Sequence, residues 1–309
     1  MGRKLLAAAV LALLVVACHV TPPGMETETA IPISPTTFDL AALEEIDLSA
    51  YPVMPVVSER AREIYRVGLA QGRNPRVFSR VGDCMTAAAD FLTPFGAGDY
   101  NLSDYGDLQE TVDYFSQITI REIEGQAVNS FSNPSLAAAD GLTSAGALDS
   151  LWANPAWCRA GESPLACEYR VSNPSLALIM FGTNDSFFVE PDRFDLYMRT
   201  IVEETIEVNV VPILVTFPTR LDRPEESETF NRIVVRIATD YDVPLVNLWL
   251  ALQELPNGGV NPEEVTHLTI PADGCAACLT EENLASGLTL HNAIAVMALD
   301  EVRRALAED

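Results

Sequence analysis

A wholly apolar run that ends in a polar turn is the feature that most constrains how this chain can fold. Residues 176–181 carry no polar side chain, as expected for a strand buried on both faces of a parallel sheet. Gly182, Thr183, Asn184 and Asp185 follow directly. Parallel α/β sheets bind their ligands at the carboxyl ends of the strands. This turn is therefore predicted to face a binding crevice.

Other segments repeat the pattern of strand and helix. Residues 76–81, 209–217 and 244–248 are β-prone, and residues 194–207, 229–241 and 285–306 have apolar residues at helical spacing. Such alternation predicts βαβ units in a parallel, doubly wound sheet. No internal repeat or second domain is visible, so one α/β domain is expected at residues 58–309. The β-prone run at 76–81 also ends in a turn, at Gly82, Asp83 and Cys84.

The N-terminus has the pattern of a targeting segment. A positive start at Arg3 and Lys4 precedes an apolar run at 5–16, which is too short to span a bilayer and fits a signal peptide at residues 1–17. The run ends in a sequence that resembles a bacterial lipobox, so Cys18 is the expected lipidation site. The alternative is an ordinary signal peptide with a chance cysteine. Residues 18–57, rich in Thr, Pro and Glu, are expected to form a flexible tether.

Charge excludes one class of partner. The chain has 44 acidic and 19 basic residues, for a net charge of −25. Nucleic-acid binding needs Lys and Arg to neutralise phosphates, so no nucleic-acid partner is expected. Electrostatic docking on anionic lipid is disfavoured for the same reason. Membrane attachment would then depend on the Cys18 anchor, on the outer side of a bacterial cell membrane.

Cysteine usage fits an exported protein. Cys158 and Cys167 flank a turn-forming loop that a disulfide could close, and Cys275 and Cys278 could form a second local bridge. Local pairing leaves Cys84 as the free thiol. Two alternatives remain open, a zinc site built from these four cysteines and a redox Cys-x-x-Cys motif.

Three motifs together resemble the SGNH (GDSL-type) hydrolase family. They are Gly82-Asp83-Cys84, Gly182-Thr183-Asn184-Asp185 and Glu264-Val265-Thr266-His267. The resemblance runs from about residue 73 to the C-terminus. It implies a flavodoxin-like three-layer α/β/α sandwich and hydrolysis of ester bonds in small-molecule or glycan substrates.

The resemblance also implies a role for each motif residue. Cys84 falls on the nucleophile position, His267 on the base and Glu264 on its supporting acid. Asn184 and Gly141 fall on the oxyanion-hole donors, and Gly82, Asp83, Gly182 and Asp185 on supporting positions. This chain departs from the family twice, with Cys in place of the nucleophilic Ser and Glu in place of Asp.

The residues at these positions could together carry out acyl transfer. A thiol at a strand tip before a helix is expected to have a lowered pKa. His267 would take its proton, and Glu264 would fix the imidazole tautomer. The acyl-enzyme would form on sulfur, so no metal or organic cofactor is expected.

Each position also has a plainer interpretation. Cys84 could be an inert packing residue in a protein that binds a glycan or acyl ligand without turnover. Asn184 and Asp185 could form only a turn, and Glu264 could be a surface carboxylate. His291 is expected to be a helix-surface or packing residue, and the alternative is that it is the base.

Overall fold

The computed structural model describes residues 38–307. Its main sheet consists of β1 (Asn74–Gly82), β4 (Pro174–Met180), β5 (Val211–Val215) and β6 (Leu245–Val246) in the order β1-β4-β5-β6, with every pair parallel. A separate antiparallel hairpin is formed by β2 (Arg121–Ile123) and β3 (Gln126–Val128). The four strands of the main sheet confirm the four β-prone runs of the sequence.

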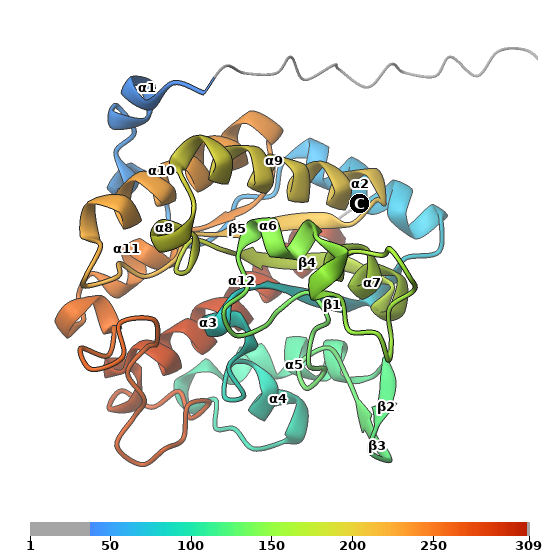
Figure 1. The fold of residues 1–309 in the computed structure, drawn as a ribbon. Helices are drawn as coiled ribbons and strands as arrows, with labels where there is room; N and C mark the ends of the chain where they lie inside the picture. Colours follow the sequence, from blue (N-terminus) through green and yellow to red (C-terminus); the bar gives the residue numbers. More distant parts are fainter. Residues whose placement is uncertain (1–37, 308–309) are drawn as a thin grey trace, which may run out of the picture. The chain divides into compact units, whose positions relative to one another are not determined.

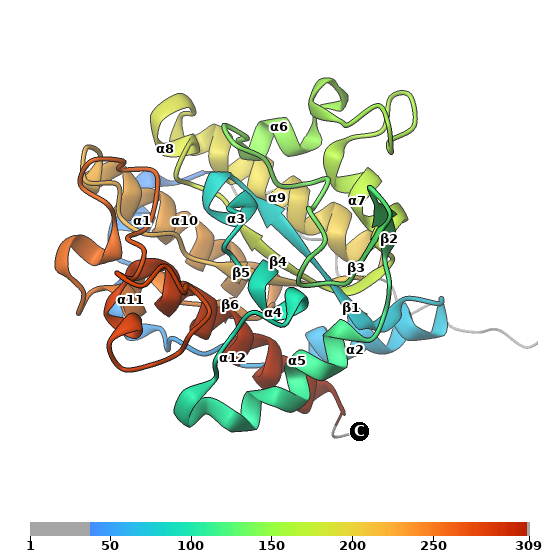
Figure 2. The same cartoon turned by 90° about the horizontal axis from the view of Figure 1, so that it is seen from below.

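Helices cover both faces of this sheet, as Figures 1 and 2 show. The α-helices are α1 (Leu40–Glu44), α2 (Glu59–Ala70), α3 (Cys84–Ala87), α4 (Thr93–Ala97), α5 (Gln109–Ser116), α6 (Ser144–Leu148), α7 (Pro164–Ser172), α8 (Asp185–Phe188), α9 (Pro191–Glu207), α10 (Pro224–Tyr241), α11 (Leu248–Leu252) and α12 (Gly287–Ala307). The 3-10 helices are η1 (Leu48–Ala50), η2 (Ser103–Leu108), η3 (Ser150–Trp152), η4 (Pro256–Gly259) and η5 (Asn283–Ala285).

The layers form a three-layer α/β/α sandwich. In Figure 1, α2, α9 and α10 lie above the sheet and α5 and α12 lie below it. Every residue of β4 and β5 is buried, because helices cover both faces of these central strands. The doubly wound α/β architecture expected from the sequence is therefore confirmed. Within the described residues, no helix combines the length and the apolar character that a bilayer crossing requires.

The outer edge of β1 carries one more extended segment. Gly82 forms a parallel bridge with Ala138, and its N–H donates to the carbonyl of Ala137 at 3.0 Å. This segment lies where the second strand of a flavodoxin-like 2-1-3-4-5 sheet would lie. It also brings residues 137–142 to the end of β1, beside Cys84.

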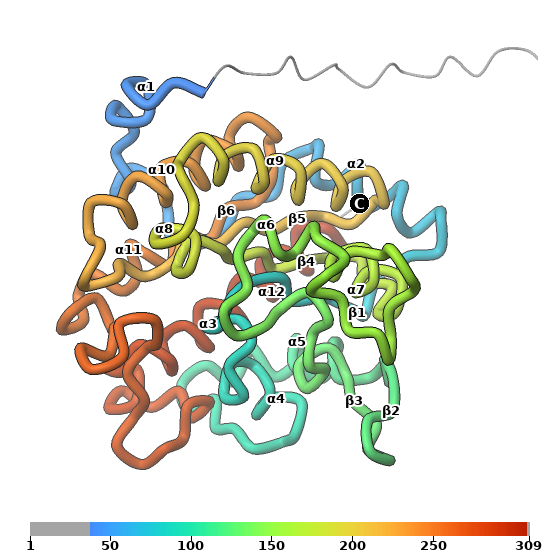
Figure 3. The backbone as a smooth tube through the Cα atoms, in the orientation of Figure 1, coloured from blue at the N-terminus to red at the C-terminus, as the bar shows by residue number. Residues whose placement is uncertain are grey.

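The folded unit begins earlier than the sequence predicts. It begins at Phe38, whereas the tether was expected to extend to residue 57. Leu43 and Leu48 are buried, and the side-chain amide of Asn247 donates to the carbonyls of Leu48 (2.8 Å) and Tyr51 (3.0 Å). The two buried leucines and the hydrogen bonds from Asn247 fix residues 38–57 against the domain. The rest of the expected tether and the signal peptide lie outside the described residues. The tube in Figure 3 follows this path from α1 into the domain.

Replacement of one of these leucines tests the docking of residues 38–57. We expect Leu48→Ala to lower the free energy of unfolding by about 2–5 kcal/mol, the usual effect of truncating a buried leucine. Leu40→Ala is the matched control, because Leu40 is 48% exposed. Urea denaturation gives both values. Equal, small effects for the two variants would mean that the segment is a tether after all.

Candidate active site

The turn that carries Cys84, the expected nucleophile, lies at the end of β1 and is fixed by a carboxylate. The carboxylate of Asp83 caps α3 by accepting from the N–H of Met85 at 3.1 Å, which places Cys84 at the first position of this short helix. Gly82 has no room for a side chain, because a Cβ there would lie 2.2 Å from Oγ1 of Thr86 and 2.4 Å from the carbonyl oxygen of Met180. The sequence Gly-Asp-Cys therefore produces a tight strand-to-helix turn.

The second turn follows β4 and is tied to the first. The other carboxylate oxygen of Asp83 accepts from the N–H of Thr183 at 3.2 Å. Gly182 has a φ of 136°, and a Cβ there would lie 2.0 Å from the ring of Phe217. Only glycine fits this position. The two motifs, 100 residues apart in the chain, thus meet at one edge of the sheet.

A third segment completes this side of the site. The side-chain amide of Asn184 donates to the carbonyl of Leu142 at 3.0 Å, and Asp185 accepts from the N–H (2.9 Å) and the hydroxyl (2.5 Å) of Ser144. Gly141, which has a φ of 73°, directly precedes Leu142. The two residues expected to supply oxyanion-hole donors therefore belong to segments in contact with each other.

The loop after η4 contacts Cys84 through Thr266, the residue before His267. The thiol of Cys84 donates to the carbonyl oxygen of Thr266 at 3.5 Å, and Thr266 directly precedes His267. The carboxylate of Glu264 lies 3.9 Å from Nδ1 of His267, with the two side chains 68% and 46% exposed. This distance exceeds that of a hydrogen bond. Nδ1 instead shares a hydrogen bond with the hydroxyl of Thr266 at 3.1 Å, in a direction that depends on the tautomer of the ring.

The expected lowering of the thiol pKa is wrong. Burial is the main cause that raises the pKa of Cys84 to about 12, and the carboxylates of Asp83 and Asp140 contribute to the same rise. The single turn of α3 does not offset these effects. Desolvation likewise raises the pKa of Asp83 to about 7, with a contribution from the neighbouring Asp185, and raises that of Asp185 to about 6. The resting thiol is therefore neutral.

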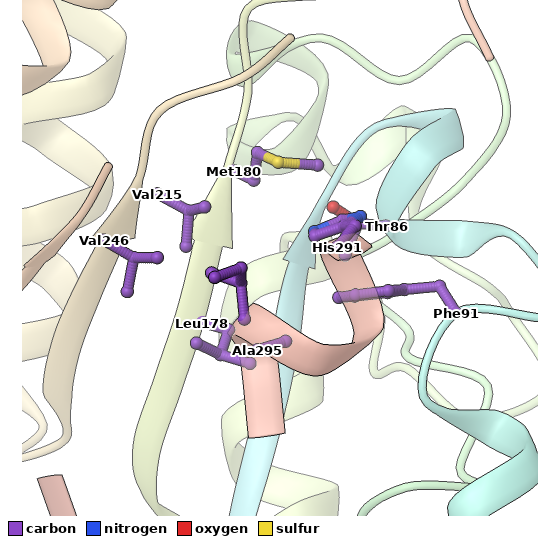
Figure 4. A pocket seen from close by; sticks show the side chains of 9 residues that line it. Thr86, Phe91, Leu178, Met180, Val215, Val246, His291 and Ala295 are labelled. Atoms are coloured by element: carbon purple, nitrogen blue, oxygen red, sulfur yellow. The ribbon is translucent and has the colours of Figure 1, made fainter. Parts of the chain in front are cut away.

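His291 is a packing residue rather than the base. It lies in α12, 2% exposed, and its ring stacks on Phe91 with 4.0 Å between the centroids. Desolvation lowers its pKa to about 3. Figure 4 shows it beside Thr86 in a small cavity whose other walls are mostly apolar. Of the two histidines within residues 38–307, only His267 lies on the loop that contacts the thiol.

Two cavities adjoin the site. One, of about 200 Å³, is lined by His267, Glu264 and the apolar side chains of Met85, Leu268 and Ile270, among others. A larger one, of about 500 Å³, is lined by residues 97–100 and 274–278, among others. The two share Ala89 and Asp90. A ligand in the smaller cavity would touch the imidazole.

Both predicted disulfides are confirmed, with S–S distances of 2.07 Å for Cys158–Cys167 and 1.96 Å for Cys275–Cys278. Cys84 is the free cysteine of the described residues, and it is buried. Among residues 38–307, Cys158, Cys167 and Glu162 are close enough to hold a metal ion. The two sulfurs are bonded to each other, however, and Glu162 pairs with Arg170 at 2.7 Å. A zinc site from the four cysteines is therefore excluded in this state.

Sequence reasoning missed three residues that shape the site. Ser144 binds Asp185, Thr266 contacts both the thiol and the imidazole, and Arg220 donates to the carbonyl of Thr183 at 3.0 Å. The position of Arg220 shortly after β5 is a usable signal, because residues after parallel strands lie at the ligand-binding edge. No comparable signal marks Ser144 or Thr266.

No family model and no curated protein matches this chain. Among solved structures, it is similar to the psychrotrophic esterase EstA from Pseudoalteromonas sp., with 17% identity, 75% of this chain and 100% of that chain covered, and a TM-score of 0.45. It is also similar to a lipase/acylhydrolase from Enterococcus faecalis (18% identity, 74% and 96% covered, TM-score 0.45) and to an acetylxylan esterase from Geobacillus stearothermophilus (17%, 72% and 93%, TM-score 0.42).

The pKa of Cys84 can be tested by alkylation. A pKa of about 12 leaves roughly a thousandfold less thiolate at neutral pH than an ordinary cysteine has. We therefore expect iodoacetamide to modify Cys84 far more slowly than glutathione at pH 7.5. The rate should rise with pH through pH 10 without a plateau, because the thiol stays protonated over that range. Peptide mass spectrometry measures the rate, and rapid modification that is constant above pH 7 would contradict the raised pKa.

Proposed function

We propose that this protein is an ester-bond hydrolase of the SGNH type with a cysteine nucleophile. One observation carries the proposal: the thiol of Cys84 contacts the loop that bears His267, at a sheet edge shared with Asn184. Nucleophile, base and oxyanion donors are the three components that acyl transfer requires. The cavity of about 200 Å³ beside the imidazole offers space for part of a small-molecule or glycan ester.

The reaction would begin with proton transfer from Cys84 to His267. The sulfur then attacks the acyl carbon, and the oxyanion is held by the backbone N–H groups of Cys84 and Gly141 and the amide of Asn184. Removing one such donor typically reduces the rate by about 10²–10³. The imidazolium protonates the leaving alcohol, and a thioester remains on sulfur. Water activated by His267 hydrolyses this thioester and releases the acid, and no cofactor is needed.

A second candidate function is ligand binding without turnover. The raised pKa of the thiol and the lack of a hydrogen bond between Glu264 and His267 favour it specifically. In such a pseudoenzyme the same crevice would hold a glycan or acyl ligand, and Cys84 would serve as a packing residue.

Two substitutions at Cys84 separate these candidates. If the protein is a cysteine hydrolase, Cys84→Ala and His267→Ala should each lower kcat on a panel of p-nitrophenyl esters and thioesters by at least about a thousandfold, as removal of a nucleophile or base does. If the wild-type protein does not hydrolyse these esters and Cys84→Ser does, the result would support the ligand-binding candidate. Turnover that survives Cys84→Ala unchanged would exclude sulfur as the nucleophile.

We also propose that the protein is exported and anchored to the outer side of the membrane through Cys18, which lies outside the described residues. The support is the lipobox-like sequence that ends at Cys18. We expect palmitate labelling of the wild type and of Cys84→Ala, and no labelling of Cys18→Ala. Labelling that persists in Cys18→Ala would show that the anchor is elsewhere.

A further inference from the structure

We infer that Thr266 is a positioning residue for both reacting groups. The inference rests on the proposed function, because it concerns the same thiol and imidazole. Thr266 contacts both at once: its carbonyl oxygen accepts from the thiol of Cys84 at 3.5 Å, and its hydroxyl lies 3.1 Å from Nδ1 of His267. No other residue within 38–307 has hydrogen bonds to both groups.

The hydroxyl of Thr266 takes the place that the resemblance gives to a carboxylate. Glu264 stands 3.9 Å from Nδ1, and both side chains are largely open to solvent. An exposed ion pair at that distance contributes little. A hydroxyl at 3.1 Å is within hydrogen-bond distance. The orientation of the ring therefore depends on Thr266 rather than on Glu264.

A hydroxyl also changes what the imidazole can do. Because it both donates and accepts, it can accept from Nδ1–H, which leaves the lone pair on Nε2 free to act as a base. It can equally donate to an unprotonated Nδ1. Thr266 thus holds the ring while permitting either tautomer, whereas a carboxylate would enforce Nδ1–H. The imidazolium form keeps the first of these hydrogen bonds.

The carbonyl of Thr266 holds the thiol of Cys84, which is the proton donor in the proposed transfer. In the resting state the S–H of Cys84 points to this oxygen, so the thiol is kept neutral beside the loop that carries its base. On activation the S–H bond breaks and an N–H bond forms on Nε2, giving a thiolate and an imidazolium. Nδ1–H then donates to the hydroxyl of Thr266, and the charge of Glu264 adds a weak, solvent-screened attraction.

The charged groups near His267 are few. Glu264 and Asp90 line the same cavity, and among the described residues that line it there is no Lys or Arg. Asp83 and Asp140 both raise the pKa of the thiol. Removing the hydroxyl of Thr266 therefore changes the hydrogen bond at Nδ1 and leaves these carboxylates in place.

Nitrogen NMR of the full-length protein tests the inference directly. The chain has three histidines, so the ring nitrogens of His267 can be assigned by substitution. Thr266→Val is nearly isosteric and lacks the hydroxyl, Thr266→Ala is a second truncation, and Thr266→Ser keeps the hydroxyl. We expect Thr266→Val and Thr266→Ala to change the tautomer populations of His267, and Thr266→Ser to match the wild type.

Two glutamate variants complete the design. Glu263→Gln is the matched surface control, because Glu263 is exposed on the same loop, and it should leave the spectra unchanged. Glu264→Gln should change them less than Thr266→Val does. A larger change in Glu264→Gln, or unchanged spectra in both Thr266→Val and Thr266→Ala, would overturn the inference.

Kinetics supply a second readout that a merely structural role would not reproduce. We expect Thr266→Val to lower kcat about five- to tenfold, as loss of one hydrogen bond does, with KM within twofold and with rescue by Thr266→Ser. If the protein has no esterase activity, the NMR spectra still test the role of Thr266. Failure of the proposed function can therefore be distinguished from failure of this inference. If Thr266→Val hydrolyses esters with the kcat of the wild type and gives the spectra of the wild type, the inference about Thr266 is rejected and the proposed hydrolase function is not.

Discussion

The rest of the site depends on the two hydrogen bonds that the carboxylate of Asp83 accepts. One oxygen caps the helix that begins at Cys84, and the other accepts from the backbone of Thr183. The side chain is fully buried, which raises its pKa to about 7. This one side chain thereby links the ends of β1 and β4, which are distant in sequence. Asn184, the residue after Thr183, is placed at the same edge of the sheet.

The same burial that fixes the geometry also raises the pKa of the Cys84 thiol. A thiol next to carboxylates and away from water prefers to keep its proton. Here that preference is met by a hydrogen bond to the carbonyl of Thr266. The proposed hydrolysis would require this proton to move from the thiol to His267. The proposed ligand binding without turnover would leave it on the sulfur, so the same geometry is compatible with both proposals.

Much of the fold was predictable because buried parallel strands leave a strong local signal. The apolar run of β4 and the glycines at 82 and 182 each require one backbone environment, whatever the distant sequence is. The local disulfides were predictable for a similar reason, since Cys158–Cys167 and Cys275–Cys278 close short loops. The docking of residues 38–57 could have been expected, because this stretch is itself largely apolar and only the residues before it have the composition of a tether. Which of its side chains are buried, Leu43 and Leu48 among them, depends on the tertiary structure.

The sequence by itself determined the order of strands and helices, the two glycine turns and the identity of the groups at their tips. These features depend on periodicity and on backbone conformations that neighbouring residues specify. Only the tertiary structure decided the pKa of Cys84, the burial of His291 and the contact between Thr266 and His267. Desolvation and hydrogen bonding depend on which distant atoms surround a group, and no local pattern encodes those distances.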